Sequence, residues 1–205
     1  MAVRKPFQQA HLGITQVSIT DAHRLETELP APLFYFGGEI CVICWRGYFL
    51  HTPDDSRISL PDEAATTAYA TRLAKTLNVG MVIHLRGDLG AGKTTLVRAL
   101  IHALGYTGRV KSPTYTLLEP YEAGGLHLRH FDLYRFRDKE EWEASGFRDE
   151  FDGRNVCLVE WPEKAQDLMP QADLDIQFDI EPQGRSITLH ANTETGRTCL
   201  DSLRS

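Results

Sequence analysis

Hydrophobic and polar residues follow a regular order only beyond residue 58 of this chain. Ser59 or Asp62 can cap a first helix, in which apolar residues recur on one face to about Leu77. The mostly apolar run Met81–Leu85 has the length of a buried strand, and Thr94–Leu104 repeats apolar residues at helical spacing before a glycine ends it. The pattern therefore predicts a helix, a strand and a second helix in succession.

Strand signals dominate the second half of the chain. We expect an extended stretch to Tyr121, a strand at Leu126–Leu133, an acidic helical segment at Asp138–Ser145, a buried strand at Asn155–Glu160, and a hairpin of Leu174–Ile180 and Arg185–Ala191. The hairpin segments alternate apolar and polar residues, which is typical of antiparallel strands, whereas continuous apolar runs are typical of parallel ones. The pattern predicts an α/β fold with a mixed parallel and antiparallel sheet.

A glycine-rich loop separates the first expected strand from the second helix. It reads Gly87-Asp88-Leu89-Gly90-Ala91-Gly92-Lys93-Thr94, a complete G-x-x-x-x-G-K-T motif. Its glycines let backbone N–H groups wrap closely around phosphates, its lysine reaches the β- and γ-phosphates, and its threonine hydroxyl is placed for Mg²⁺. Because the motif stands between a strand and a helix, it predicts nucleotide binding and a P-loop NTPase-like three-layer sandwich.

Two carboxylates compete for the second position beside Mg²⁺ that such a site requires. Glu160 ends the more apolar strand and is favoured for the metal, while Asp132 ends the shorter and more polar stretch Leu128-Arg129-His130-Phe131-Asp132. Either carboxylate could instead cap the turn that follows it. Thr114 and Thr116 lie about twenty residues past Lys93, where a switch-like loop could bring a hydroxyl to Mg²⁺ or the γ-phosphate. Their alternative explanation is the ordinary preference of threonine for strands.

Composition narrows the classes of function. The chain has 205 residues, of which 42% are hydrophobic and 24% charged, as in ordinary globular proteins. A formal net charge of −6 argues against unaided binding of nucleic acid, which depends on Lys and Arg that neutralise phosphates. The apolar stretch Leu33–Leu50 contains Glu39 and Arg46, which disfavours a membrane span. No export signal is evident, so we expect a cytoplasmic protein.

The four cysteines do not suggest a disulfide framework in a chain of this size. Cys41 and Cys44 form a C-x-x-C pair, but a structural zinc site needs four ligands and the surroundings lack the pattern of a redox motif. We expect these two thiols to be unpaired. Cys157, inside an expected buried strand, is expected in the core.

Three basic side chains lie near Asp132 in the sequence. His130 is expected to pack in the core or against the residues that line the site, rather than to take part in catalysis. Arg135 and Arg137 have the pattern of solvated charges, and neither can be identified from the sequence as an arginine that acts on a transferred phosphate. Activation by a partner is therefore expected if the protein hydrolyses nucleotide.

Four motifs together resemble the bacterial TsaE (YjeE) family, the ATPase of tRNA threonylcarbamoyladenosine synthesis. They are the loop Gly87–Thr94 extended to Thr95, Val110-Lys111-Ser112-Pro113-Thr114-Tyr115-Thr116-Leu117, His130-Phe131-Asp132-Leu133-Tyr134-Arg135, and Leu158-Val159-Glu160-Trp161-Pro162. The loop alone is generic, but the other three in this order and spacing are specific. The resemblance covers roughly residues 59–191.

The resemblance implies an auxiliary ATPase that uses ATP and Mg²⁺ and works with the proteins TsaB and TsaD. Those partners place a threonylcarbamoyl group on N6 of adenosine 37 in tRNAs that read ANN codons, and ATP binding and hydrolysis would reset their complex. Contact with tRNA would then be indirect. By this resemblance Lys93 and Thr94 serve phosphate and Mg²⁺, Glu160 is the metal-side acid, Asp132 is the acid needed for activity, and Thr114 belongs to the first switch.

The resemblance assigns three further residues to the nucleotide side of the site. Trp161 adjoins the metal-side acid, while Glu63 and Arg185 fall where nucleotide contacts of the family lie. Residues 1–58 depart from the family, and we expect either an over-long start or an appendage, followed by an ATPase domain at 59–205. A small-molecule P-loop kinase and a non-hydrolysing, nucleotide-dependent scaffold remain alternative functions.

Overall fold

The computed structural model describes residues 33–36, 39–42 and 57–204 of the chain, which forms two compact units, 1–52 and 53–205. In the first unit, β1 (Leu33–Phe36) pairs with β2 (Glu39–Val42) in antiparallel fashion. Most of the segment 1–58, and with it Cys44, lies outside the described residues. The expectation about the origin of this segment and the expectation about the C-x-x-C thiols therefore stay predictions.

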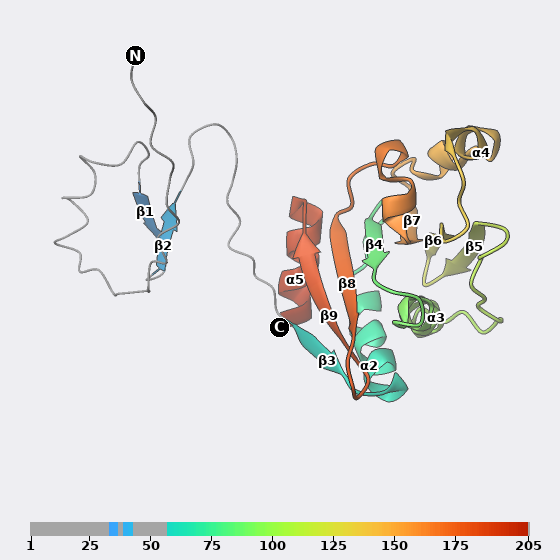
Figure 1. The fold of residues 1–205 in the computed structure, drawn as a ribbon. Helices are drawn as coiled ribbons and strands as arrows, with labels where there is room; N and C mark the ends of the chain where they lie inside the picture. Colours follow the sequence, from blue (N-terminus) through green and yellow to red (C-terminus); the bar gives the residue numbers. More distant parts are fainter. Residues whose placement is uncertain (1–32, 37–38, 43–56, 205) are drawn as a thin grey trace, which may run out of the picture. The chain divides into compact units, whose positions relative to one another are not determined.

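The second unit is built on a seven-stranded sheet with the order β3-β9-β8-β4-β7-β6-β5 (Figure 1). The strands are β3 (Ile58–Leu60), β4 (Val82–Arg86), β5 (Leu118–Ala123), β6 (Leu126–Asp132), β7 (Asn155–Glu160), β8 (Leu174–Ile180) and β9 (Arg185–Ala191). The central strands β8, β4, β7 and β6 run parallel, while β5, β9 and β3 pair in antiparallel fashion at the edges. The expected mixed sheet is confirmed.

Helices cover both faces of this sheet. The helices are α2 (Glu63–Ala74), α3 (Lys93–Ala103), α4 (Lys139–Ala144) and α5 (Glu194–Arg204). A 3-10 turn at Phe147–Glu150 lies between α4 and β7, and two more, at Pro162–Lys164 and Gln166–Leu168, lie between β7 and β8. Alternate residues of a strand point to opposite faces, and Val156 and Leu158 of β7 join the buried cluster formed with α2, α3 and α5. Their neighbour Val159 joins a second cluster that includes α4 and the first 3-10 turn. The expected three-layer sandwich is confirmed.

Aromatic rings fill the second cluster. Phe131 of β6 is fully buried, and its ring centroid lies 5.5 Å from that of Phe147, 5.2 Å from that of Phe151 and 6.4 Å from that of Trp142. Cys157 lies in the same cluster, as expected from the sequence, and burial raises the pKa of its thiol to about 12. This cluster fastens α4 and the neighbouring turn to strands β6 and β7.

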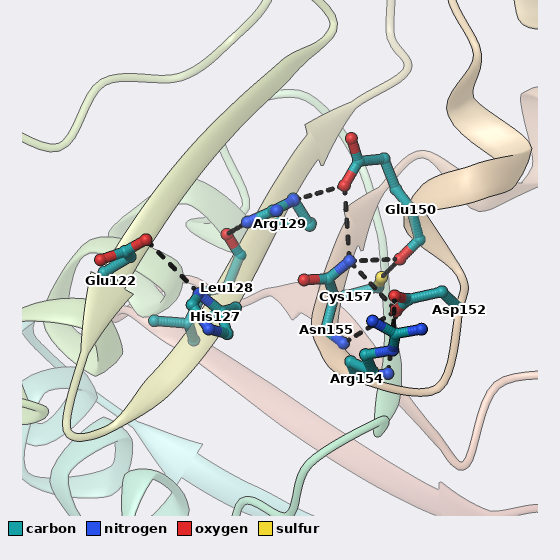
Figure 2. A network of polar contacts seen from close by, with 9 residues as sticks. All are labelled: Glu122, His127, Leu128, Arg129, Glu150, Asp152, Arg154, Asn155 and Cys157. Carbon is teal, nitrogen blue, oxygen red and sulfur yellow. Dashed lines mark hydrogen bonds and ion pairs between the residues drawn. The ribbon is translucent and has the colours of Figure 1, made fainter.

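A polar network ties the opposite, amino-terminal ends of the same two strands together (Figure 2). Arg129 of β6 forms an ion pair with Glu150, and the side-chain amide of Asn155 at the start of β7 donates to the Glu150 carbonyl at 3.0 Å. Asp152 accepts the backbone N–H of Arg154 at 2.8 Å, and this bond lowers the pKa of its carboxyl group. The network fixes the register of β6 and β7, whose far ends carry the candidate site.

Some boundaries differ from the sequence expectation. Asp62, not Ser59, caps α2 by accepting the N–H of Ala65 at 2.7 Å, and Ser59 instead lies in β3, a strand that the sequence analysis missed. The helix ends at Ala74 rather than near Leu77, because the N–H groups of Lys75 and Thr76 donate to carbonyls three residues earlier, at 3.1 and 3.0 Å, instead of four. Helix α5 was also missed. None of the helices among the described residues is both long and apolar enough to cross a membrane.

The aromatic cluster predicts a large effect of truncation on stability. Phe131→Ala removes a fully buried ring and its contacts with three others, so we expect the free energy of unfolding in urea to fall by about 3–5 kcal/mol. Ile180→Ala provides the control, because the side chain is 59% exposed and its loss should change stability by no more than about 0.5 kcal/mol. Equal effects of the two substitutions would contradict the described core.

Candidate functional site

The glycine-rich loop connects β4 to α3 at the carboxyl ends of the parallel strands. Gly92 begins the helix with φ 101°, in the left-handed region, and a Cβ at this position would lie 1.5 Å from Nη1 of Arg185. At Gly87, with φ 132°, a Cβ would lie 2.5 Å from the Phe178 carbonyl oxygen. Glycine is therefore needed at both positions to let the loop fold closely against the sheet.

Lys93 points back into this loop. Its Nζ donates to the carbonyl oxygens of Gly87 at 2.6 Å and Asp88 at 2.9 Å, and it lies 3.9 Å from the centroid of the Trp161 ring. The residue is only 4% exposed, and burial lowers the pKa of its ammonium group, although the carboxylate of Glu160 and other acids counteract the shift. The loop thus contains a desolvated cation that is held by carbonyls and an aromatic face.

Glu160 ends β7 beside the first turn of α3. The register pairs it with Leu85 of β4 and with Asp132 of β6, so the two carboxylates end neighbouring strands. Its carboxylate is almost fully buried and accepts the hydroxyl of Thr94 at 2.8 and 3.0 Å. Nε2 of the fully buried His130 lies 2.8 Å from the same carboxylate, and because the carboxylate can only accept, that nitrogen carries the proton.

Asp132 lies at the end of β6 and holds the loop that precedes β5. Its carboxylate accepts hydrogen bonds from the hydroxyls of Ser112 and Thr114, the latter at 2.8 Å. The other oxygen accepts the backbone N–H of Tyr134 at 3.1 Å. The carboxylate therefore couples the position of the loop to the end of the strand.

Two residues next to these acids have backbone conformations that non-glycine residues rarely adopt. Trp161 follows Glu160 with φ 60°, and Leu117 closes the Ser112–Thr116 loop with φ 62°. Both residues are tied by backbone hydrogen bonds, since the N–H of Trp161 donates to the Leu85 carbonyl at 3.3 Å and that of Leu117 donates to the Pro113 carbonyl at 2.6 Å. Such strain is frequent at functional sites, where the surrounding structure holds it in place.

These groups surround one cavity of about 540 Å³. Its lining comprises Leu89, Gly90, Gly92, Lys93, Thr94, Thr95, Ser112, Thr114, Asp132, Tyr134, Arg135, Glu160 and Trp161. Of the remaining sequence candidates, Gly87, Asp88 and Ala91 belong to the loop but not to the lining, and Arg185 lies against Gly92. Glu63 lies apart, in a neighbouring groove between α2 and α3 that shares only Thr95 with the cavity.

His130 is fully buried against Glu160, as expected from the sequence. The structure adds three residues that were not predicted to lie in the site, because Ser112, Tyr134 and Arg135 also line the cavity. Each of these residues stands within one of the four motifs named above, and that membership was the signal in the sequence that could have identified it. Ser112 lies in the loop before β5, and Tyr134 and Arg135 lie in the turn after β6, so their positions depend on a loop and a turn that a motif alone does not specify.

A glycine-rich loop between a central parallel strand and a helix, with acids at the ends of two neighbouring strands, is the arrangement of the P-loop NTPase-like fold. The family model described as "Threonylcarbamoyl adenosine biosynthesis protein TsaE" matches residues 60–193. The chain therefore belongs to the TsaE family, which takes part in tRNA threonylcarbamoyladenosine biosynthesis.

Individual relatives agree with this membership. The TsaE protein of Haemophilus influenzae is 41% identical over 148 residues, which cover 70% of this chain and 94% of that protein. The TsaE protein of Bacillus subtilis is 43% identical over 116 residues, or 57% of this chain and 71% of that protein. The crystal structure of Bacillus subtilis YdiB superposes with a TM-score of 0.59 at 32% identity, and the match covers 73% of this chain and 93% of that one.

The burial of Lys93 predicts a pH dependence of stability. Because burial lowers its pKa below 10.5 in the folded chain, the unfolded chain binds more protons between that lowered pKa and 10.5. Stability is therefore gained as the pH rises through this window. We expect the free energy of unfolding of the natural chain, measured relative to Lys93→Met, to increase from neutral pH toward 10.5. A difference that stays constant or falls would contradict this interpretation.

Proposed function

We propose that this protein is a Mg²⁺-dependent ATPase that assists the proteins TsaB and TsaD in the N6-threonylcarbamoylation of adenosine 37 in tRNAs that read ANN codons. The observation that carries the proposal is the convergence of Lys93, Thr94, Asp132 and Glu160 on one cavity beside a glycine-rich loop. In P-loop proteins, the same residue types bind phosphates and metal.

The cavity has the features that a nucleoside triphosphate needs. Its volume of about 540 Å³ falls in the range of small-molecule sites. Gly92 has φ 101°, which side chains rarely allow, and in loops of this kind the backbone N–H groups point toward phosphate oxygens. Lys93 is already desolvated and would exchange its two carbonyl acceptors for negatively charged oxygens, which bind an ammonium group more strongly.

Thr94 and Glu160 fit a magnesium ion. Mg²⁺ prefers oxygen ligands and is usually held by one or two protein groups together with substrate phosphates, so a hydroxyl beside a carboxylate suffices. When bound, the ion would neutralise negative charge on the β- and γ-phosphates. His130 donates to one oxygen of Glu160 and thereby orients the carboxylate toward the first turn of α3.

Asp132 is the residue that we assign to hydrolysis, either by positioning water or by acting as a switch that a partner can sense. Its carboxylate is 4% exposed and holds Thr114 at 2.8 Å, so any movement of the Ser112–Thr116 loop changes the groups around it. Thr114 contributes a hydroxyl close to where the γ-phosphate would lie. Preorganised polar groups of this kind stabilise charge that develops in a transition state.

The role is auxiliary, with TsaB and TsaD as partners and tRNA reached through their complex. This assignment is supported by membership of the TsaE family and by the net charge of −6, which does not favour unaided binding to RNA. We place the protein in the cytoplasm, where the tRNA is modified.

Steady-state ATP hydrolysis by the full chain, alone and with TsaB and TsaD of the same organism, tests this proposal. We expect stimulation by the partners, and we expect Lys93→Ala and Asp132→Asn to lower the rate by about 10²-fold or more. Lys139→Ala and Asp167→Asn are the matched controls, because both residues are exposed. These two variants should hydrolyse ATP at the rate of the natural chain.

Three outcomes would contradict the proposal. Hydrolysis at the full rate without partners would exclude the auxiliary role, and phosphate transfer to a small acceptor in place of water would indicate a kinase. Tight ATP binding with no turnover, with or without partners, would indicate a nucleotide-dependent scaffold.

A further inference from the structure

Arg135 is the second cationic side chain in the lining of the candidate cavity, besides Lys93. The two cations differ in their contacts. Lys93 is held by two carbonyls at the base of the loop. Within residues 57–204, no ion pair or hydrogen bond engages the guanidinium of Arg135, which instead lies 4.7 Å from the centroid of the Tyr115 ring. Its five N–H donors are therefore available to a ligand in the cavity.

The backbone that carries Arg135 is firmly fixed. The preceding residue, Tyr134, donates its N–H to Asp132, and the following residue, Phe136, donates its N–H to Leu133 at 3.0 Å. Leu133 and Phe136 are both buried in the second core cluster. The side chain of Arg135 thus projects from a rigid turn immediately after Asp132, and it can move without disturbing the fold.

The ring that holds Arg135 belongs to the loop around Asp132. Tyr115 follows Thr114, whose hydroxyl binds Asp132, and the tyrosine is 85% exposed. An exposed cation–π contact is weak, so phosphate oxygens that bind the guanidinium in two places would readily replace it. The contact keeps the guanidinium beside the cavity while leaving it free to turn inward.

We propose that Arg135 is a catalytic residue of ATP hydrolysis, whose guanidinium binds the γ-phosphate oxygens, and that Tyr115 is a positioning residue that keeps Arg135 beside the cavity. This inference rests on the function proposed above and adds a cation supplied by the chain itself. Its basis is that Arg135, whose guanidinium has no hydrogen bond or ion pair within residues 57–204, lines the same cavity as Asp132, Thr114 and the glycine-rich loop.

The chemistry explains why a second cation would matter. In hydrolysis, a water oxygen forms a bond to the γ-phosphorus, and the bond from that phosphorus to the bridging oxygen breaks with its electron pair staying on ADP. The protons of the water leave with inorganic phosphate or pass to solvent. Charge spreads over the three outer oxygens in the transition state, and a guanidinium that donates to two of them stabilises it.

Single-turnover hydrolysis and ADP affinity of the full chain test this assignment. We expect Arg135→Ala to slow hydrolysis by about 10²-fold or more. Arg135→Lys should still be at least about tenfold slower than the natural chain, because an ammonium group lacks the planar pair of donors. ADP affinity should change by less than about twofold, since ADP has no γ-phosphate. Arg137→Ala is the matched control, because Arg137 is exposed and does not line the cavity.

The positioning role of Tyr115 is tested by the hydrolysis rates of its own variants. Loss of an exposed cation–π contact in Tyr115→Ala should slow hydrolysis by about two- to fivefold. Tyr115→Phe keeps the ring and should restore the natural rate. Because Tyr115 acts through Arg135, Tyr115→Ala should cause no further loss in a chain that already carries Arg135→Ala.

The outcomes separate this inference from the function on which it rests. If the natural chain hydrolyses ATP and Arg135→Ala stays within about threefold of its rate, the assignment of Arg135 is wrong while the ATPase proposal stands. If ADP affinity falls as strongly as the rate, Arg135 binds the nucleotide in general and is not specific to the reacting phosphate. A natural chain that hydrolyses no ATP, alone or with the partners, would overturn both proposals.

Discussion

The buried carboxylate of Glu160 is the constraint on which the arrangement of the site depends. An ionised carboxylate loses its hydration when it is buried and needs donors in compensation, which Thr94 and His130 supply at 2.8 Å. These two bonds join three elements: the end of β7, the first turn of α3 and the middle of β6. The glycine-rich loop is consequently held over the sheet edge by the same acid that we assign to the metal.

The second acid organises the opposite side of the cavity. Asp132 is next to Glu160 in the sheet register, but its donors come from the Ser112–Thr116 loop and from the turn that carries Arg135. One carboxylate therefore binds the first turn of α3, next to the glycine-rich loop, whereas the other binds the Ser112–Thr116 loop. Under the proposed function, a nucleotide placed between them would compete for both sets of hydrogen bonds, and a partner protein could sense the resulting change in the loop.

The strongly patterned elements and the placement of the glycine-rich loop between a strand and a helix could be predicted from the sequence because local signals define them. Strands β7, β8 and β9 have the expected bounds, since alternation and apolar runs end at clear turn residues. Strand β3 has three residues and gains its hydrogen bonds from β9, so it has no local signature. Helix α5 was missed although its buried residues Gly196, Cys199, Leu200 and Leu203 recur at helical spacing, because glycine, cysteine and threonine have low intrinsic preference for helices. The position of Arg135 in the cavity depends on the turn after β6, which a motif alone does not specify.

The most direct test of the account is the Mg²⁺ dependence of ATP binding, measured by calorimetry for the natural chain and for Glu160→Gln. If Glu160 and Thr94 hold the ion, the natural chain should bind ATP more tightly as Mg²⁺ is added, and Glu160→Gln should lose most of that gain while keeping similar affinity without the ion. Glu160→Gln retains an oxygen that can accept from Thr94, so the fold should persist. An unchanged Mg²⁺ dependence in Glu160→Gln would contradict the assignment of Glu160 and the central place given to it.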